Sequence, residues 1–147
     1  MTKYIALLRG INVGGQKIIK MADLRDFLSK AGFNNVSTYI QSGNIVFESS
    51  ESTITILENK IKEVIEKHYG FIVPTFILTL LEVKNAINKQ PFKDIDNKRL
   101  YLTFLSENPK EGGMDEIKRY QTNGEELILI DKVLYMYSPN GVGRSKL

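Results

Sequence analysis

Residues 4–15 read Tyr-Ile-Ala-Leu-Leu-Arg-Gly-Ile-Asn-Val-Gly-Gly, an apolar run followed at once by a glycine-rich segment. The run from Tyr4 to Leu8 shows no polar alternation, which is typical of a strand buried on both faces rather than an edge strand. Glycine and asparagine then dominate, which predicts a turn-rich loop with Ile11 and Val13 as two apolar anchors. This stretch therefore predicts a central strand and a loop around which the first half of the chain is organised.

An amphipathic helix follows the loop, because apolar residues recur there every three or four positions: Met21, Leu24, Phe27, Leu28 and Ala31. Gly32 stands where helices often end, since glycine adopts the left-handed conformation without strain. A second helix, from about Thr53 to Tyr69, carries an apolar face made of Leu57, Ile61, Val64, Ile65 and His68. Gly70 ends it, so the pattern predicts two helices of moderate length in the first half.

Strands separate and follow the two helices. Val36, Thr38 and Ile40 alternate with polar residues, and an apolar run resumes at Ile45 after the short break Ser42-Gly43-Asn44, which predicts a hairpin. A further strand covers residues 73–78, with Pro74 near its start, where an edge strand tolerates a missing N–H. Residues 3–79 thus read β-α-β-β-α-β, the ferredoxin-like order, in which the first and third strands are central and the fourth is an edge.

The second half repeats part of this order. A helix opens at Thr79, a strand covers residues 100–105, a short helix follows Gly112-Gly113, and a hairpin turns around Asp131-Lys132. We therefore predict an α+β fold of tandem ferredoxin-like (βαββαβ) units, the second lacking its last helix and strand. The predicted parts are residues 1–79 and residues 80–147, the latter a connecting helix plus the incomplete second unit, packed as one body. An incomplete unit exposes apolar surface, which keeps a homo-oligomer open as a hypothesis.

Composition excludes several kinds of chemistry. The 147 residues contain no cysteine, which removes disulfides, thiolate nucleophiles and sulfur-ligated metals, and His68 is the one histidine, so we predict no metal and no cofactor. The net charge is +3 without a basic stripe, which places nucleic acid last among the partners considered. Neither a membrane-spanning run nor a secretory leader is predicted, and we expect a cytoplasmic protein.

Three segments resemble one bacterial family. Leu8-Arg9-Gly10-Ile11-Asn12-Val13-Gly14-Gly15, then Tyr39-Ile40-Gln41-Ser42-Gly43-Asn44, and then Gly141-Val142-Gly143-Arg144-Ser145-Lys146 are similar to its signature, in the same order. The family is the uncharacterised domain of unknown function 1697. The resemblance covers essentially the whole chain and implies tandem ferredoxin-like units but no activity. It also implies a further helix and a Thr-Arg-Asn-rich stretch beyond the last segment, which we expect this chain to lack.

The loop after the first strand is the first candidate site for a ligand. Its glycines let backbone N–H groups approach an anion closely, Arg9 and Lys17 flank it, and the predicted binding residues here are Arg9, Gly10, Asn12, Gly14, Gly15 and Lys17. The spacing matches neither a phosphate-binding Walker loop nor a dinucleotide fingerprint. A tight strand–helix connection whose glycines serve geometry alone is the competing interpretation.

Two further segments complete the list. Gln41 and Asn44 lie in the predicted hairpin, which leaves the sheet at the same end as the loop, although Ser42 and Asn44 also suit an ordinary turn. Arg144 and Lys146 form the third candidate, with a solvated connector as the alternative. The preferred hypothesis is a binding module for a small anionic ligand, nucleotide or phosphate. The alternatives are an enzyme that uses carboxylate, lysine or arginine chemistry, and a weak nucleic-acid binder.

Overall fold

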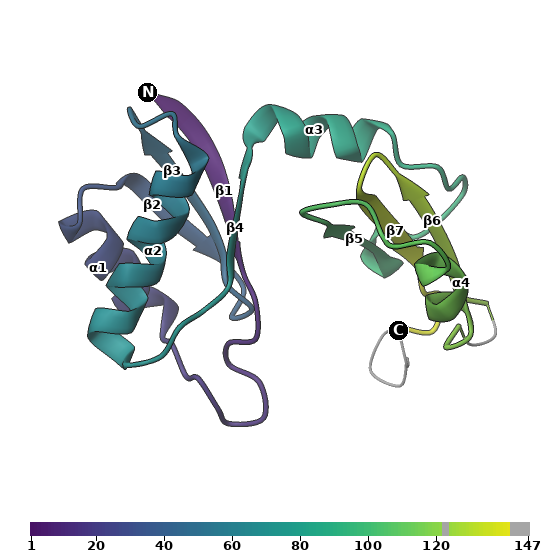
Figure 1. Ribbon diagram of the computed structural model, residues 1–147, viewed down its shortest axis with the longest axis horizontal. Helices are drawn as coiled ribbons and strands as arrows, with labels where there is room; N and C mark the ends of the chain where they lie inside the picture. Colours follow the sequence, from purple (N-terminus) through teal and green to yellow (C-terminus); the bar gives the residue numbers. More distant parts are fainter. Residues whose placement is uncertain (122–123, 142–147) are drawn as a thin grey trace. The chain divides into compact units, whose positions relative to one another are not determined.

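The computed structural model describes residues 1–121 and 124–141. These residues form two compact units, Met1–Lys84 and Asn85–Leu147, and each is described by itself. The protein is a mixed α/β molecule with two antiparallel sheets and four α-helices among the described residues (Figure 1). None of the described helices is long and apolar enough to cross a membrane. The boundary predicted between residues 79 and 80 stays a prediction.

The first unit is a four-stranded sheet with two helices on one of its faces (Figure 1). Its elements are β1 (Thr2–Leu8), α1 (Met21–Lys30), β2 (Asn34–Tyr39), β3 (Asn44–Ser49), α2 (Ile54–Tyr69) and β4 (Thr75–Thr79), and α3 (Leu80–Asn88) follows directly. The strands lie in the order β2-β3-β1-β4, and every neighbouring pair is antiparallel. The predicted element order is confirmed, as are the central positions of the first and third strands.

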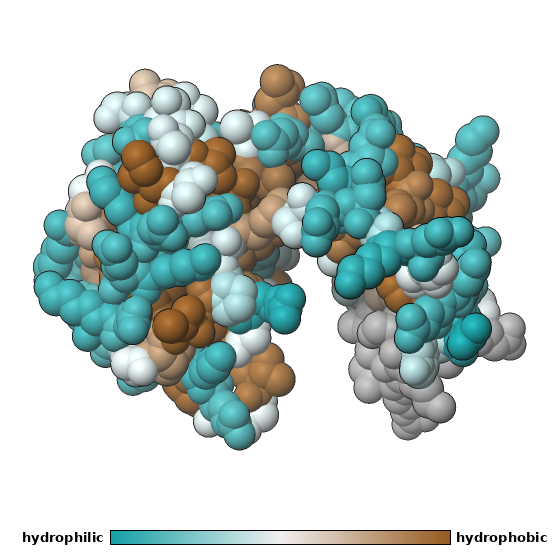
Figure 2. Space-filling view, viewed as in Figure 1, coloured by the Kyte–Doolittle hydropathy of each residue, from teal (hydrophilic) through white to brown (hydrophobic). Residues whose placement is uncertain are grey.

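The core lies between this sheet and the two helices. Tyr4, Ala6 and Leu8 alternate inward along β1, and Leu57 and Ile61 of α2 are at most 1% exposed. Figure 2 shows that the solvent side of the helices is largely hydrophilic, as the amphipathic spacing predicts. The opposite face of β1 is less buried than predicted, because Ile5 and Leu7 keep intermediate exposure.

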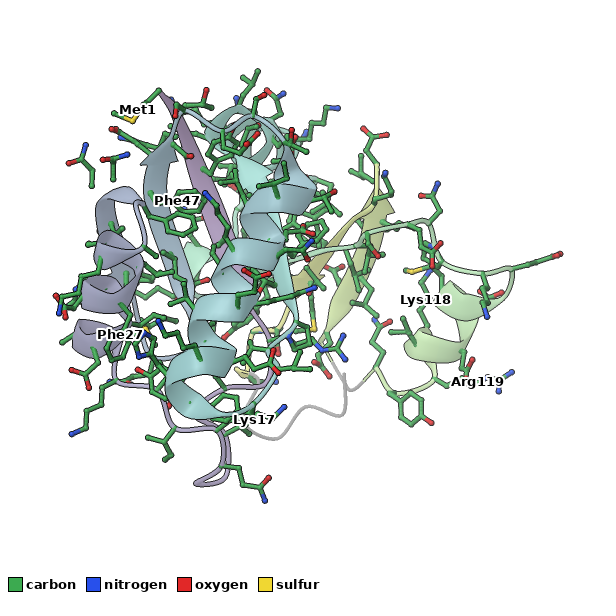
Figure 3. All side chains as sticks on the ribbon, turned by 60° about the vertical axis from the view of Figure 1, so that its left-hand side comes forward. Met1, Lys17, Phe27, Phe47, Lys118 and Arg119 are labelled. Atoms are coloured by element: carbon green, nitrogen blue, oxygen red, sulfur yellow. The ribbon has the colours of Figure 1, made fainter. Side chains whose placement is uncertain are left out.

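Aromatic side chains complete this core. Phe47 of β3 is fully buried and meets the ring of Phe33 edge to face at 5.0 Å. Phe27 of α1 stacks on His68 of α2, with 3.7 Å between ring centroids (Figure 3). Such ring pairs add about 0.5–1.5 kcal/mol beyond the area they bury. His68 is exposed, so it lies at the edge of the predicted apolar face, where its ring stacks on Phe27.

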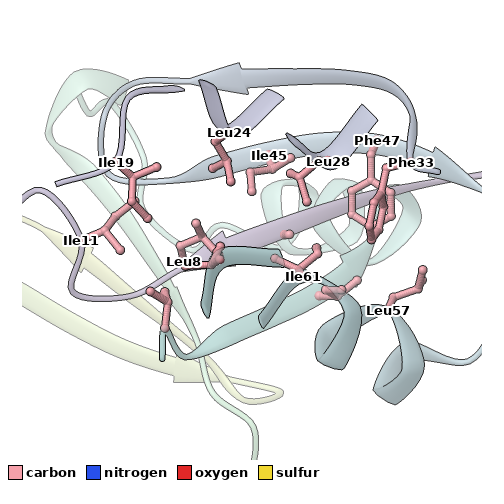
Figure 4. Packing of buried hydrophobic residues seen from close by; sticks show 14 of the residues in the cluster. Leu8, Ile11, Ile19, Leu24, Leu28, Phe33, Ile45, Phe47, Leu57 and Ile61 are labelled. Carbon is pink, nitrogen blue, oxygen red and sulfur yellow. The ribbon is translucent and has the colours of Figure 1, made fainter. Parts of the chain in front are cut away.

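Three local predictions are wrong. Ile40 does not extend β2: it has φ +53° and is 58% exposed in the turn. Val13 is no anchor, since it is 66% exposed, and Ile19 buries in its place beside Ile11 (Figure 4). The fourth strand begins at Thr75 rather than residue 73, since Pro74 has no backbone N–H to donate to a neighbouring strand.

The second unit is a three-stranded antiparallel sheet in the order β5-β7-β6. Its elements are a 3-10 turn (Asn97–Arg99), β5 (Leu100–Phe104), α4 (Gly113–Lys118), β6 (Glu126–Ile130) and β7 (Val133–Tyr137). Asp131 and Lys132 both have positive φ, which makes the two-residue turn typical of a tight hairpin. Tyr135 is fully buried, and its hydroxyl donates to the Ala86 carbonyl near the end of α3 at 2.5 Å.

Candidate functional site

The loop after β1 is folded into a small hairpin of its own. The amide of Asn12 donates to the Lys17 carbonyl at 3.1 Å, and that of Gln16 donates to the Val13 carbonyl at 3.1 Å. Gly14 and Gly15 form the tip with φ +58° and +72°. Positive φ at both central residues is the type I′ pattern, which glycine adopts at no steric cost. The two glycines are therefore explained by the turn, and their amides lie at an exposed tip.

Asn12 fixes this loop to the rest of the unit. Its side-chain Oδ1 accepts from the Ile19 amide at 2.7 Å, and its Nδ2 donates to the Ile19 carbonyl at 3.0 Å and to the Gln41 carbonyl at 2.7 Å. Asn12 also has φ +53°, a conformation that asparagine tolerates better than most residues. Because all three bonds go to backbone, the geometry gives Asn12 a positioning role in the candidate site.

The β2–β3 hairpin leaves the same end of the sheet as the loop, as the topology predicted, and it lies closer than predicted, in direct contact with the loop. The Leu8 amide donates to the Gly43 carbonyl at 2.9 Å. A Cβ at residue 43 would lie 2.7 Å from Leu8 Cβ and 2.9 Å from Ile11 Cδ1, so only glycine fits. The Asn44 side chain donates to the Tyr39 carbonyl and to Ser42 within the hairpin, and Gln41 is exposed. The structure thus brings the two candidate segments together through backbone contacts.

Two buried isoleucines anchor the loop to the core. Ile11 is 2% exposed and Ile19 is fully buried, and Figure 4 shows both among the side chains that surround Leu8 and Leu24. Fully burying an isoleucine contributes about 1.5–3 kcal/mol relative to leaving it exposed. The ends of the loop are therefore held, and the residues between them are presented to solvent in a set conformation.

Three cations lie on this loop without a carboxylate among residues 9–20. Arg9, Lys17 and Lys20 are exposed, and within residues 1–121 and 124–141 none of them forms an ion pair. The Lys17 ammonium lies 6.0 Å from the centroid of the Phe71 ring, and Figure 3 labels it at this end of the unit. The loop therefore carries three positive charges that are not paired with a carboxylate in the described part of the chain.

Tyr69 lies beside this positive end, in contact with Phe27 and Phe71. Burial raises the pKa of its hydroxyl above the ordinary value, and the negative charge of Asp23 raises it further. Tyrosine is neutral at physiological pH even at its ordinary pKa, and the raised pKa of Tyr69 extends that neutral range upward. It therefore adds no negative charge next to Lys17.

The remaining predicted residues lie elsewhere. Arg144 and Lys146 fall outside the described residues, so that candidate stays a prediction. A shallow hollow between α1 and α2 is lined by Ala31, Lys60, Glu63, Val64 and Lys67 and contains none of the predicted site residues. No group of three or more His, Cys, Asp or Glu side chains in the described part of the chain has an arrangement that could hold a metal ion.

Sequence patterns missed part of this surface. Lys20 extends the positive charge, and Ile18, Ile40 and Ile72 lie exposed on the loop or on segments that contact it. The adjacent pair Ile18-Ile19 carries a usable signal, because neighbours in an extended segment point to opposite sides and only one can face the core. For Ile72 no sequence signal separates it from the buried Val73 that follows.

Comparison with known proteins gives the family. The family model described as "Protein of unknown function (DUF1697)" matches residues 1–135. The chain belongs to this family. The match confirms the family resemblance and includes the first two of the three sequence segments, and the family description assigns no activity.

A solved structure with the same fold supports this assignment. A conserved bacterial protein, SP0830 from Streptococcus pneumoniae, is similar with a TM-score of 0.74 and 28% sequence identity. The alignment covers 93% of this chain and 77% of the other. A search of the curated proteins found no match. The comparisons therefore establish family and fold, and the function has to be argued from the site.

Proposed function

We propose that the first unit is a binding module that recognises an anionic ligand at the end of the sheet, on the loop of residues 9–20. One observation carries the proposal: Arg9, Lys17 and Lys20 are exposed on a loop without carboxylates, and Asn12 holds that loop with three hydrogen bonds. Binding a partner costs less when the binding groups are already ordered. The ligand that we predicted from the sequence, a phosphate or a nucleotide, carries the charge that these cations attract.

The backbone of the loop supports the same proposal. The amides of Gly14 and Gly15 are exposed at the tip of the turn, on the same hairpin as Lys17. Successive backbone N–H groups in a turn can form concave anion-binding sites. The ligand would therefore be contacted by charge from side chains and by hydrogen bonds from the main chain.

We propose in addition that both units are ferredoxin-like and that the protein works in the cytoplasm. The strand order β2-β3-β1-β4 and the order β5-β7-β6 support a tandem arrangement, since the three shared positions correspond. In that arrangement the loop of residues 9–20 and the β2–β3 hairpin belong to one end of the first unit, which is the end proposed for binding.

A thermal-shift experiment tests the binding proposal. The wild-type chain is melted with inorganic phosphate, pyrophosphate and ATP at low ionic strength, where exposed charges are least screened. We expect a higher melting temperature with at least one anion, and a smaller shift in Arg9→Ala and Lys17→Ala. Lys118→Ala and Arg119→Ala, which remove exposed cations from the second unit, serve as matched controls and should keep the full shift. If none of the three anions stabilises the wild type, the proposal is wrong.

A further inference from the structure

The same loop end exposes aliphatic side chains that the fold does not need there. Val13 is 66% exposed, Ile18 57%, Ile40 58% and Ile72 63%. Two isoleucines of the same loop, Ile11 and Ile19, are at most 2% exposed. Anchoring the loop therefore accounts for two of its four aliphatic residues and leaves the other two in water.

The exposed residues come from segments that contact one another. The loop reaches the β2–β3 turn through the bond from Asn12 to the Gln41 carbonyl, next to Ile40. It also approaches the segment after α2, where Lys17 lies over Phe71, next to Ile72. Figure 2 shows hydrophobic beside hydrophilic side chains where the loop projects beyond the sheet. The four aliphatic side chains and the three cations thus belong to one end of the unit, which we call the loop end.

The charge of the loop end is of one sign. Residues 9–20 contain three cations and no acid, and residues 39–44 and 70–75 contain no charged side chain at all. Exposed apolar surface bordered by polar groups marks interaction sites, and Tyr39, 72% exposed at the end of β2, is a residue type enriched at protein interfaces. A partner surface that complements the loop end therefore carries both acidic and apolar side chains.

We infer that the loop end docks an acidic segment of another protein, whose carboxylates meet Arg9 and Lys17 and whose apolar side chains cover Ile18 and Ile72. The inference rests on the proposed function, because it assigns the anion to a polypeptide. A small anion such as phosphate would leave the aliphatic side chains in water. An anionic membrane surface attracts cations through its overall charge and requires no fixed arrangement of the kind that Asn12 and Gly43 impose.

Selection from a peptide library tests the inference. A phage-displayed library of random dodecapeptides is panned against the wild-type chain at low salt, and a selected peptide is synthesised for titration. We expect the selected sequences to combine Asp or Glu with Leu, Ile or Phe. The double variant Ile18→Ser with Ile72→Ser should weaken binding of that peptide at least tenfold. Leu81→Ser, which changes an equally exposed aliphatic residue on α3, is the matched control and should bind as the wild type does.

Further arms separate this inference from the proposed function. If selected peptides lack acids, or bind the Ile18/Ile72 double variant as tightly as the wild type, the inference is overturned. If the Ile18/Ile72 double variant keeps the thermal shift with phosphate, the proposed anion binding stands and does not depend on these two aliphatic side chains. If Lys17→Gln leaves peptide affinity unchanged, the inference is overturned as well, because it assigns the partner's carboxylates to this cation. Vesicles of equal phosphatidylglycerol and phosphatidylcholine form the last arm, and binding to them in place of peptides would assign the surface to lipid.

Discussion

The two units build corresponding strands with very different connections. In the first unit, residues 9–20 join the first strand to its helix and residues 40–43 join the next two strands. In the second unit, the connection from the first strand to its helix consists of residues 105–112, and the connection between the next two strands consists of Asp131-Lys132 alone. Since the order β5-β7-β6 forms with a two-residue turn, the longer segments of the first unit exceed what the strand order requires. Extra chain that is nevertheless held by specific bonds indicates a role beyond the fold.

The difference extends to how the connections are held. The β6–β7 turn contacts the rest of its unit through the Leu105 amide, which donates to the Lys132 carbonyl at 2.8 Å, and through an exposed pair, Asp131 with Lys89 at 2.9 Å. The connections of the first unit interlock through Asn12 and through the close approach of Gly43 to Leu8. We therefore expect substitutions at these positions to cost far more stability in the first unit than in the second, and the following experiments measure that difference.

Gly43→Ala should have the largest effect. The new Cβ would lie 2.7 Å from Leu8 Cβ and 2.9 Å from Ile11 Cδ1, at a φ of +91° that alanine disfavours. Overpacking and left-handed strain together predict a loss of about 2–4 kcal/mol in the free energy of unfolding, measured by urea denaturation.

Gly32→Ala is the control for that measurement. Gly32 has φ +102° but nothing within 4 Å of its ideal Cβ, so it isolates the backbone term, about 1–2 kcal/mol. Equal losses in the two variants would show that the hairpin and the loop are not tightly packed against each other, and the argument from interlocking would then fail.

Asn12→Ala should come second. It removes three hydrogen bonds to backbone, one of them to the hairpin, and each contributes about 0.5–1.5 kcal/mol, so we expect roughly 2–3 kcal/mol in urea denaturation. Hydrogen exchange at the Ile19 amide, which now bonds Asn12 Oδ1, should speed up strongly.

Asn35→Ala provides the matched comparison for Asn12. Asn35 also has positive φ, +49°, but its side chain makes a single exposed bond, to Glu48 at 2.7 Å. The backbone strain is therefore shared and the number of bonds differs. A loss as large as that of Asn12→Ala would mean that backbone strain, and not the three hydrogen bonds of the Asn12 side chain, dominates the effect.

Much of this architecture was predictable from local pattern. Helical spacing located α1 and α2, and the glycine at Gly70 takes the left-handed conformation that ends α2. The hairpin of residues 126–137 lies where the sequence predicted it, because Asp131 and Lys132 break two strong apolar runs. Topology alone also predicted that the loop and the β2–β3 hairpin leave the same end of the sheet.

The details of the candidate site were not predictable in the same way. The partners of Asn12 lie 7 and 29 residues away along the chain, and no local rule links such positions. Ile40 continues the alternation of β2 in sequence, yet its positive φ ends the strand and turns the side chain to solvent. Periodicity assumes that an element continues, and it fails where a turn reverses the chain.

Tyr135→Phe tests the second unit and should have a moderate effect. The hydroxyl donates to the Ala86 carbonyl at 2.5 Å in a buried position, so its removal should cost about 1–2 kcal/mol in urea denaturation. Burial raises the pKa of Tyr135, which means that the folded state holds this proton more tightly than the unfolded chain.

The pH dependence gives that prediction a second readout. The contribution of Tyr135 is fully present below the unfolded pKa of about 10 and is lost as pH rises through the higher folded pKa. The wild type should therefore lose stability steeply above about pH 10, and Tyr135→Phe should lose less over the same range. Parallel pH profiles for the two proteins would contradict the assignment of a buried donor.

The pair Lys89–Asp131 should matter least. Both side chains are more than half exposed, at 57% and 71%, so water and salt screen their attraction, and exposed pairs generally contribute little. The hydrogen bond and charge of Asp131 raise the pKa of Lys89, so what stability the pair gives is present below the unfolded lysine pKa and disappears as pH rises through the folded one. Lys89→Gln, Asp131→Asn and the double variant, compared by urea denaturation at low and high salt, should differ only slightly and only at low salt. An interaction free energy between Lys89 and Asp131 as large as the loss in Asn12→Ala would show that the short turn of the second unit is held as firmly as the long connections of the first.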